Sequence, residues 1–307
     1  MFIVFARVHP KSVLRETEQR EAVLWQVSTS RRLAFLLSES SLFVFSHRLL
    51  MLTCGRTNMH QALREILDRI APAARLTPGW VQLSHRALLA PAAQPVPHRT
   101  PEASLECMHM LLPKAYETVL GAPMRFPWYA FTAQLAPVQV QPSIAVYMHG
   151  LPQRVCDAYT DPAGAKVYVR HDLHCRLPPG FVPLDTHCFE PQGYSANGGT
   201  MQKNGYWTVH VTPQPNATYA SLEAGAQAEQ HEALLSTCLE HFCPRRACVV
   251  QQGVLVSELC SSPMPEYELV EHEFRLLLGD VPVCARWLAL RADPVRIEAT
   301  GAPSAPV

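Results

Sequence analysis

The feature that most constrains the fold of this chain is a series of short strand-type segments that alternates with helical patterns along most of its length. Apolar, β-branched and aromatic residues predict strands at 33–45, 47–54, 79–88, 128–136, 143–149, 166–171, 205–212, 217–223, 247–256 and 267–277. Apolar residues at helical spacing predict helices at 14–26, 58–71, 101–112, 151–159 and 227–242. Strands and helices in alternating blocks are typical of a layered α+β domain.

No shift in composition marks a boundary between domains, and a chain of this length could form one large α/β domain or two smaller ones. A chain of 307 residues with 48% apolar content can bury a large core. The proline- and alanine-rich stretch at 89–101 is expected to be a loop, and 293–307 is expected to be a disordered tail.

The charge balance excludes several classes of partner. The 26 basic and 26 acidic residues cancel, which gives no electrostatic footprint for nucleic acid or for an anionic membrane surface. Near the start, Arg7, His9 and Lys11 interrupt an apolar run before it could cross a membrane. Ten cysteines with no signal peptide are typical of reduced thiols. We therefore expect a cytoplasmic protein that binds a small molecule.

Two groups of cysteines and histidines raise the question of a metal site. The groups are Cys238, His241, Cys243 and Cys248, and His171, His174 and Cys175. Neither has a paired C-x-x-C spacing, and Cys238 falls on the apolar stripe of a predicted helix. Buried or incidental thiols are the favoured interpretation over a zinc site, so no metal is predicted.

Polar residues interrupt one of the apolar strand patterns. The run Leu37–Phe45 contains Glu39, Ser40 and Ser41 in succession. A buried strand normally excludes carboxylates and hydroxyls that have no partner, because their desolvation is costly. On their own, such serines are more often strand hydroxyls bonded to the backbone. Likewise, a lone Cys54 is more often a buried thiol, and a lone His210 a core histidine.

Together with its neighbours, this segment carries a more specific signal. The segments Leu37–Phe45, Leu52–Gly55, Phe189–Gly198 and Tyr206–Pro213 resemble the self-cleavage site of S-adenosylmethionine decarboxylases of the eukaryotic type. The resemblance runs from about Glu21 to about Pro265. It implies that residues 1–292 form a single domain, a four-layer αββα sandwich. In such a sandwich two antiparallel sheets lie face to face with helices outside, and the halves are copies of an internal duplication.

The resemblance also implies that the chain makes its own cofactor. The Ser40 hydroxyl would attack the carbonyl of Glu39, which releases a β chain of residues 1–39. The α chain, 40–307, would then begin with a covalent pyruvoyl group made from Ser40. Such a group forms a Schiff base with a substrate amine and accepts the electrons left when CO2 departs.

Further roles follow from the same motifs. Ser195 would assist the acyl shift, and His210 would take the proton from Cα of Ser40, which suits an imidazole that titrates near neutrality. Cys54 would return a proton to the substrate carbon after decarboxylation. The substrate, S-adenosylmethionine, would contact Phe189 through its adenine and Gln214 through its ribose. Two further contacts would come from Leu37 and Glu39.

Two functions remain open. The first is decarboxylation of S-adenosylmethionine to the aminopropyl donor for spermidine and spermine synthesis; the second is a catalytically weak or dead regulatory paralogue that activates a true decarboxylase subunit. The cleavage residues favour the enzyme. Two departures from the family favour the regulatory paralogue. Thr212-Pro213-Gln214 replaces a Thr-Pro-Glu motif, and the family's N-terminal Phe-Glu-Gly-x-Glu-Lys segment has no counterpart. The expected partners are the substrate, the chain's own β chain and a second subunit in a homo- or heterodimer.

Overall fold

The computed structural model describes most of the chain, and all statements below concern the described part. That part comprises residues 2–5, 25–29, 32–37, 40–45, 47–53, 57–73, 77–88, 91–123, 126–137, 139–160, 173–189, 192–201, 204–214, 218–255 and 264–291. Among these residues no helix has the length and apolar character needed to span a membrane. The described residues also contain no group of three or more His, Cys, Asp or Glu side chains arranged to hold a metal ion.

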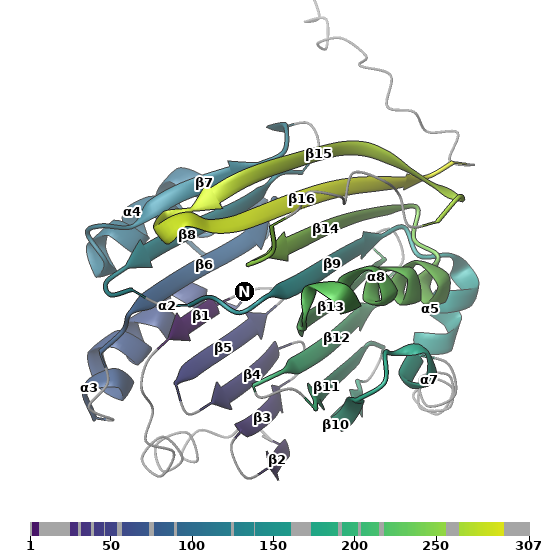
Figure 1. Ribbon diagram of the computed structural model, residues 1–307, viewed down its shortest axis with the longest axis horizontal. Coiled ribbons are helices and arrows are strands. Elements are labelled where there is room, and N and C mark those ends of the chain that lie inside the picture. Colours follow the sequence, from purple (N-terminus) through teal and green to yellow (C-terminus); the bar gives the residue numbers. More distant parts are fainter. Residues whose placement is uncertain are drawn as a thin grey trace, which may run out of the picture.

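The strands form two eight-stranded antiparallel sheets (Figure 1). The first has the order β2-β3-β4-β5-β1-β6-β8-β7. Its strands are β1 (Phe2–Phe5), β2 (Trp25–Thr29), β3 (Arg32–Leu37), β4 (Ser40–Phe45), β5 (Arg48–Thr53), β6 (Trp80–Arg86), β7 (Tyr116–Leu120) and β8 (Trp128–Gln134).

The second sheet repeats this arrangement. Its strands are β9 (Ser143–His149), β10 (Phe181–Cys188), β11 (Tyr194–Thr200), β12 (Tyr206–Thr212), β13 (Tyr219–Gly225), β14 (Arg246–Gln252), β15 (Tyr267–Leu277) and β16 (Val281–Leu290). Their order is β10-β11-β12-β13-β9-β14-β16-β15, so each strand of the first sheet has its counterpart eight strands later in the chain. The predicted internal duplication is therefore visible in the topology.

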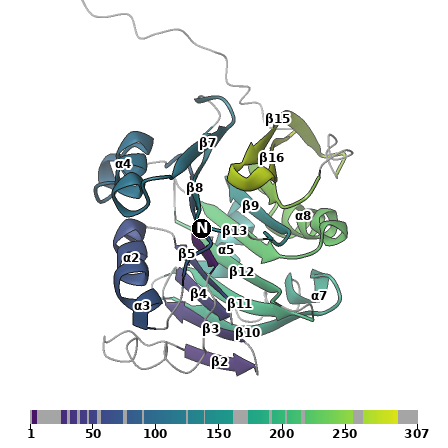
Figure 2. The same ribbon diagram turned by 60° about the vertical axis from the view of Figure 1, so that its left-hand side comes forward.

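Helices cover the outer faces of both sheets. In Figure 2, α2 and α4 lie on one side of the sheets and α7 and α8 on the other. Local sequence starts two of them: the Asn58 side chain accepts a hydrogen bond from the backbone at the N-terminus of α2, and Thr100 does the same for α4. The helices are α2 (Met59–Glu65), continued by a π-helical turn (Ile66–Ile70) and α3 (Ala71–Ala73), α4 (Pro101–Leu111), α5 (Gln153–Thr160), α7 (His174–Arg176) and α8 (Ala228–Phe242), with short 3-10 turns at Pro91–Ala93 and Leu278–Asp280.

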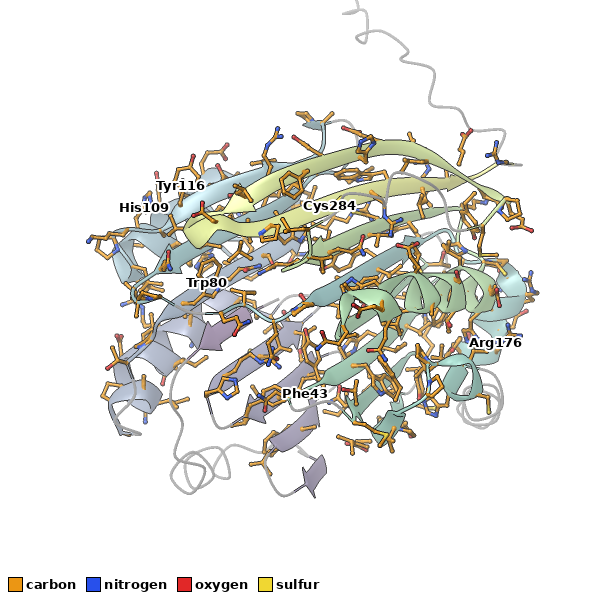
Figure 3. The ribbon with its side chains drawn as sticks, viewed as in Figure 1. Phe43, Trp80, His109, Tyr116, Arg176 and Cys284 are labelled. Atoms are coloured by element: carbon orange, nitrogen blue, oxygen red, sulfur yellow. The ribbon has the colours of Figure 1, made fainter. Side chains whose placement is uncertain are left out.

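Three apolar clusters fill the three interfaces between the four layers. The central cluster joins the two sheets and includes Phe43 and Trp80 of the first sheet, both labelled in Figure 3, and Tyr206 of the second. The rings of Phe43 and Tyr206 lie 5.2 Å apart. A second cluster packs Leu234 and its neighbours on α8 against the second sheet, and a third packs α2 and α4 against the first. The predicted αββα sandwich is thereby confirmed.

Most predicted elements are present with small shifts of their ends, but two expectations need correction. The predicted helix 14–26 overlaps strand β2 at Trp25 and Gln26, where pairing with β3 outweighs the helical periodicity; the rest of that range lies outside the described residues. The predicted strand 33–45 consists of two paired strands, β3 and β4. The stretch predicted as a loop at 89–101 consists of turns over its described residues 91–100, including a 3-10 turn, and α4 begins at Pro101. Strand 166–171 and tail 293–307 lie outside the described residues.

Six strands were not predicted. Strand β11 escaped because Tyr194–Thr200 consists mainly of small and polar residues, and β10 because Pro183 interrupts a half-exposed pattern. In β16 the charged Arg286 breaks the apolar run, although it is fully buried in the structure. The other three are β1, β2 and β7.

Candidate functional site

The site begins with a cross-strand pair on the second sheet. Ser195 of β11 and His210 of β12 are direct partners in the antiparallel register, so their side chains leave the same face of the sheet at the same level. The Ser195 hydroxyl lies 2.8 Å from Nδ1 of His210. Both residues are buried. The two residues predicted to act together in processing are thus in hydrogen-bond contact.

Two further hydroxyls complete the cluster. Ser41 of β4, on the first sheet, places its Oγ 3.0 Å from Nε2 of His210. Thr208 lies two residues before His210 and therefore faces the same side of β12. Its Oγ1 is 3.2 Å from Nε2 of His210 and 3.1 Å from Oγ of Ser41. We call Ser41, Ser195, Thr208 and His210 the hydroxyl–histidine cluster. It bridges β4 and β12, the corresponding strands of the two halves.

A buried amide fixes the sheets beside this cluster. Asn197 is two residues from Ser195 on β11, and its Nδ2 donates to the carbonyl oxygen of Phe35 on β3 over 3.1 Å. Asn197 is also the register partner of Thr208. This hydrogen bond between a β11 side chain and the β3 backbone links the two sheets next to the cluster.

Burial keeps the histidine of the cluster uncharged. His210 is 4% exposed, and its burial lowers the pKa of the imidazole to about 4. At neutral pH the ring is therefore an imidazole with one protonated and one unprotonated nitrogen, and the latter can accept a proton.

A cavity of about 420 Å³ opens beside His210. This volume is within the range of small-molecule sites. His210 and Gln214 of the second half line it together with Leu52 and Thr53 at the end of β5. A buried carboxyl, Glu223, also faces the cavity, and its burial raises the pKa of that group. The remaining lining residues are Thr57, Met59, Leu83, Ser84, His85, Arg86, Ala87, Leu88, Gln94, His98, Tyr147, His149, Tyr219 and Ser221.

Ser40 takes a different position from Ser41. It begins β4, is half-buried, and pairs with Leu37 and Thr53 in the register of the sheet. Because side chains alternate along a strand, Ser40 points to the face opposite that of Ser41. Of the two serines at the start of β4, the one in contact with His210 is Ser41, a residue that the sequence reasoning did not single out for a role.

Of the other predicted residues that the structure describes, only Gln214, which is exposed, lines the cavity. Phe189 lies half-buried directly after β10, with its ring 4.5 Å from that of His187. Leu37 ends β3 beside Ser40. Glu39 and Cys54 lie outside the described residues.

Thr208 was missed although the sequence contained a signal for it. Two residues separate it from His210, so strand alternation places both on one face once β12 is assigned. Ser41 could not be found in this way. Its contact with His210 depends on the packing of one sheet on the other, which no local pattern reports.

Buried histidines make the stability of the fold depend on pH. Burial lowers the pKa of His60 and His149 to about 3 and of His85 and His210 to about 4, against about 6.5 in an unfolded chain. Below about pH 6.5 the unfolded chain therefore binds more protons, and stability falls as the pH falls toward 4. The raised pKa of Glu223 acts in the opposite direction, because the folded chain then binds up to one proton more than the unfolded chain at that group.

A variant isolates one of these contributions. His60 is 3% exposed, and neither ring nitrogen has a hydrogen-bond partner among the described residues. We expect His60→Gln to lower the slope of unfolding free energy against pH by up to about 1.4 kcal/mol per pH unit between pH 6 and 4. Urea unfolding at several pH values measures the slope, with His272→Gln on the exposed part of β15 as control. Equal slopes in the parent and His60→Gln would contradict the assignment.

Comparisons with known proteins point to one family. Residues 11–267 match the family model for adenosylmethionine decarboxylase. The S-adenosylmethionine decarboxylase proenzyme of Xenopus laevis is 31% identical over 230 residues, which are 71% of this chain and 67% of that protein. The proenzyme of Onchocerca volvulus is 28% identical over 69% of this chain and 60% of its own length. The chain thus spans about 60 to 67% of these relatives.

A solved structure shares the fold. The crystal structure of the Trypanosoma brucei AdoMetDC-delta26 monomer superposes with a TM-score of 0.64, covering 82% of this chain and 99% of that chain. The sequence identity of 17% is low, so this likeness concerns the fold alone.

Proposed function

Because the chain belongs to the adenosylmethionine decarboxylase family, we propose that it cuts itself between Glu39 and Ser40 and then decarboxylates S-adenosylmethionine. The observation that carries this proposal is the hydroxyl–histidine cluster. It joins a neutral, buried imidazole to the strand that begins at the proposed cut.

The cut requires no external reagent before its last step. The Ser40 hydroxyl attacks the carbonyl carbon of Glu39; a C–O bond forms, the C–N bond breaks, and the hydroxyl proton passes to the released amine. Removal of the Cα proton of Ser40 then expels the carboxylate of Glu39 and leaves a dehydroalanine. Addition of water and loss of ammonia convert that residue into a pyruvoyl group.

The described residues fit this sequence of steps. The Ser41–His210 hydrogen bond anchors the start of β4, and Cα of Ser40 lies one peptide unit, about 3.8 Å, from Cα of Ser41. Neutral His210 is therefore a base held beside the residue that follows Ser40, and Ser195 lies 2.8 Å from its Nδ1. A short movement at the beginning of β4 would bring Cα of Ser40 to the ring.

The cavity is the proposed substrate site. The pyruvoyl group supplies an electron sink for decarboxylation. Four residues are proposed to bind and orient the substrate. Gln214, which lines the cavity, would hydrogen-bond the ribose, and Phe189 would stack on adenine. Leu37 and Glu39 would contact the substrate through their backbones. Cys54 follows Thr53, a cavity-lining residue, and would donate the proton that replaces CO2.

One observation favours the second candidate function, a regulatory paralogue. Gln214 offers the ribose a neutral amide where the family has a carboxylate, and a charged acceptor forms hydrogen bonds about twice as strong. A chain that cleaves itself but binds substrate weakly would fit a partner that activates another subunit.

Intact mass spectrometry under denaturing conditions tests the proposal. We expect two chains, residues 1–39 and 40–307, the larger without a free amine, whereas Ser40→Ala should remain whole. An uncut parent chain after long incubation would overturn the self-cleavage. Release of CO2 from S-adenosylmethionine by the cut protein then separates the enzyme from the regulatory paralogue, which would cut itself but release none.

A further inference from the structure

The direction of one hydrogen bond limits all others in the hydroxyl–histidine cluster. Thr208 donates its hydroxyl proton to the carbonyl oxygen of Ala196 over 3.0 Å. A hydroxyl has a single proton. Toward Ser41 and His210, Thr208 Oγ1 can therefore only accept, although it lies 3.1 Å from Ser41 Oγ and 3.2 Å from His210 Nε2.

This limit separates the two neutral forms of His210. With the proton on Nε2, the ring donates to Ser41, Ser41 donates to Thr208, Thr208 donates to Ala196, and Ser195 donates to Nδ1. Each of these short contacts then contains one proton. With the proton on Nδ1, the single proton of Ser41 can go to Nε2 or to Thr208 but not to both. Either the oxygens of Ser41 and Thr208 face each other at 3.1 Å with no proton between them, or the oxygen of Ser41 and Nε2 do so at 3.0 Å. Lone pairs then oppose each other in a buried site, which is costly.

We propose that Ser41 and Thr208 are positioning residues that hold the proton of His210 on Nε2 and so leave Nδ1, beside Ser195, as the basic nitrogen. The inference deepens the proposed self-cleavage and rests on it for its chemical meaning. The arm from Nε2 through Ser41 and Thr208 to the Ala196 carbonyl fixes the ring. Nδ1, which lies 2.8 Å from the Ser195 hydroxyl, is then the nitrogen that accepts a proton.

In many active sites a base that activates a nucleophile is itself oriented by a third group, which sets the tautomer of the base. Here the orienting group comes from both halves of the duplication, since Ser41 belongs to β4 and Thr208 to β12. Correct packing of the two sheets is therefore required before the base has a defined basic nitrogen.

The tautomer can be read directly in an uncut chain. In a Ser40→Ala background with 15N-labelled histidine, His210 is assigned among the 14 histidines by comparison with His210→Gln. We expect NMR at pH 7 to show a protonated Nε2 and an unprotonated Nδ1. Ser41→Ala and Thr208→Val should each give a mixture of forms or the opposite form, and Thr208→Ser should keep the parent spectrum. A protonated Nδ1 in the parent, or unchanged spectra in both variants, would overturn the inference.

Self-cleavage provides the second readout. Thr208→Val keeps the shape of the side chain but removes the hydroxyl, and we expect the cut to slow by about tenfold, the worth of one well-placed hydrogen bond. Thr208→Ser should restore the rate, which a loss of packing alone would not explain. Parental cleavage by Thr208→Val would contradict the role. If the parent itself remains whole, the proposed function fails, whereas the NMR result still decides the tautomer.

Discussion

Replacing His210 with glutamine is expected to stop self-cleavage at the stage of the ester. Glutamine can still hydrogen-bond Ser41 and Ser195, but it cannot take up a proton from Cα of Ser40. A positioned general base contributes about 10² to 10⁴ in rate, and His210 is the imidazole that contacts both serines. The expected product is a chain of parental mass that holds an ester in place of the peptide bond between residues 39 and 40.

Two measurements distinguish this outcome from simple misfolding. Hydroxylamine cleaves esters under conditions that leave peptide bonds intact, so it should split the variant between Glu39 and Ser40. His272→Gln, on the exposed face of β15, should process like the parent. If His210→Gln yields the pyruvoyl chain at the parental rate, the base is another group and the proposed role of His210 is wrong.

Replacing Gly198 with alanine is expected to cost about 3 kcal/mol of unfolding free energy. A Cβ at Gly198 would lie 1.9 Å from Cε2 and 2.0 Å from Nε1 of Trp207, far inside van der Waals contact. Trp207 is fully buried in the cluster beneath the outer helices of the second sheet, so its indole has little room to move. Overpacking of this kind costs about 1 to 3 kcal/mol, and the backbone of β11 must shift as well.

The same variant should also slow self-cleavage. Gly198 and Trp207 are register partners on β11 and β12, the two strands that pair Ser195 with His210. A shift between these strands changes the 2.8 Å contact between Ser195 and His210. Urea unfolding measures the stability, and Trp207→Leu in combination with Gly198→Ala provides the control, because removal of the indole should relieve the clash and make the two changes strongly non-additive. Parental stability of Gly198→Ala would contradict the packing described here.

Regular helices with capping signals could be predicted from sequence. The helices at α2 and α4 follow Asn58 and Thr100, each of which caps its helix as the residue type suggests. Strands β9 and β14 were also found, because each contains a run of at least four apolar residues, Ile144–Met148 and Ala247–Val250.

Elements whose residues depend on a partner far away in the sequence, for an ion pair or for packing, could not be predicted. Strand β16 contains Arg286, whose Nη2 donates to Glu232 of α8 over 2.6 Å. A charged residue is unusual inside a buried strand, and here its partner comes from a helix that is distant in the sequence. Strand β11 is built of small residues because Trp207 of the neighbouring strand occupies the space above Gly198. Neither partner is visible in the local pattern.

The sequence by itself determined the residue types of the site and the family to which they belong. Ser195 and His210 are recognisable from motifs in one half of the chain, and Glu39-Ser40-Ser41 from a motif in the other. Only the tertiary structure decided which serine of β4, Ser40 or Ser41, meets the histidine. One residue of strand register reverses the face of a side chain, and the sheet-on-sheet packing places Ser41, together with Thr208, on Nε2 of His210.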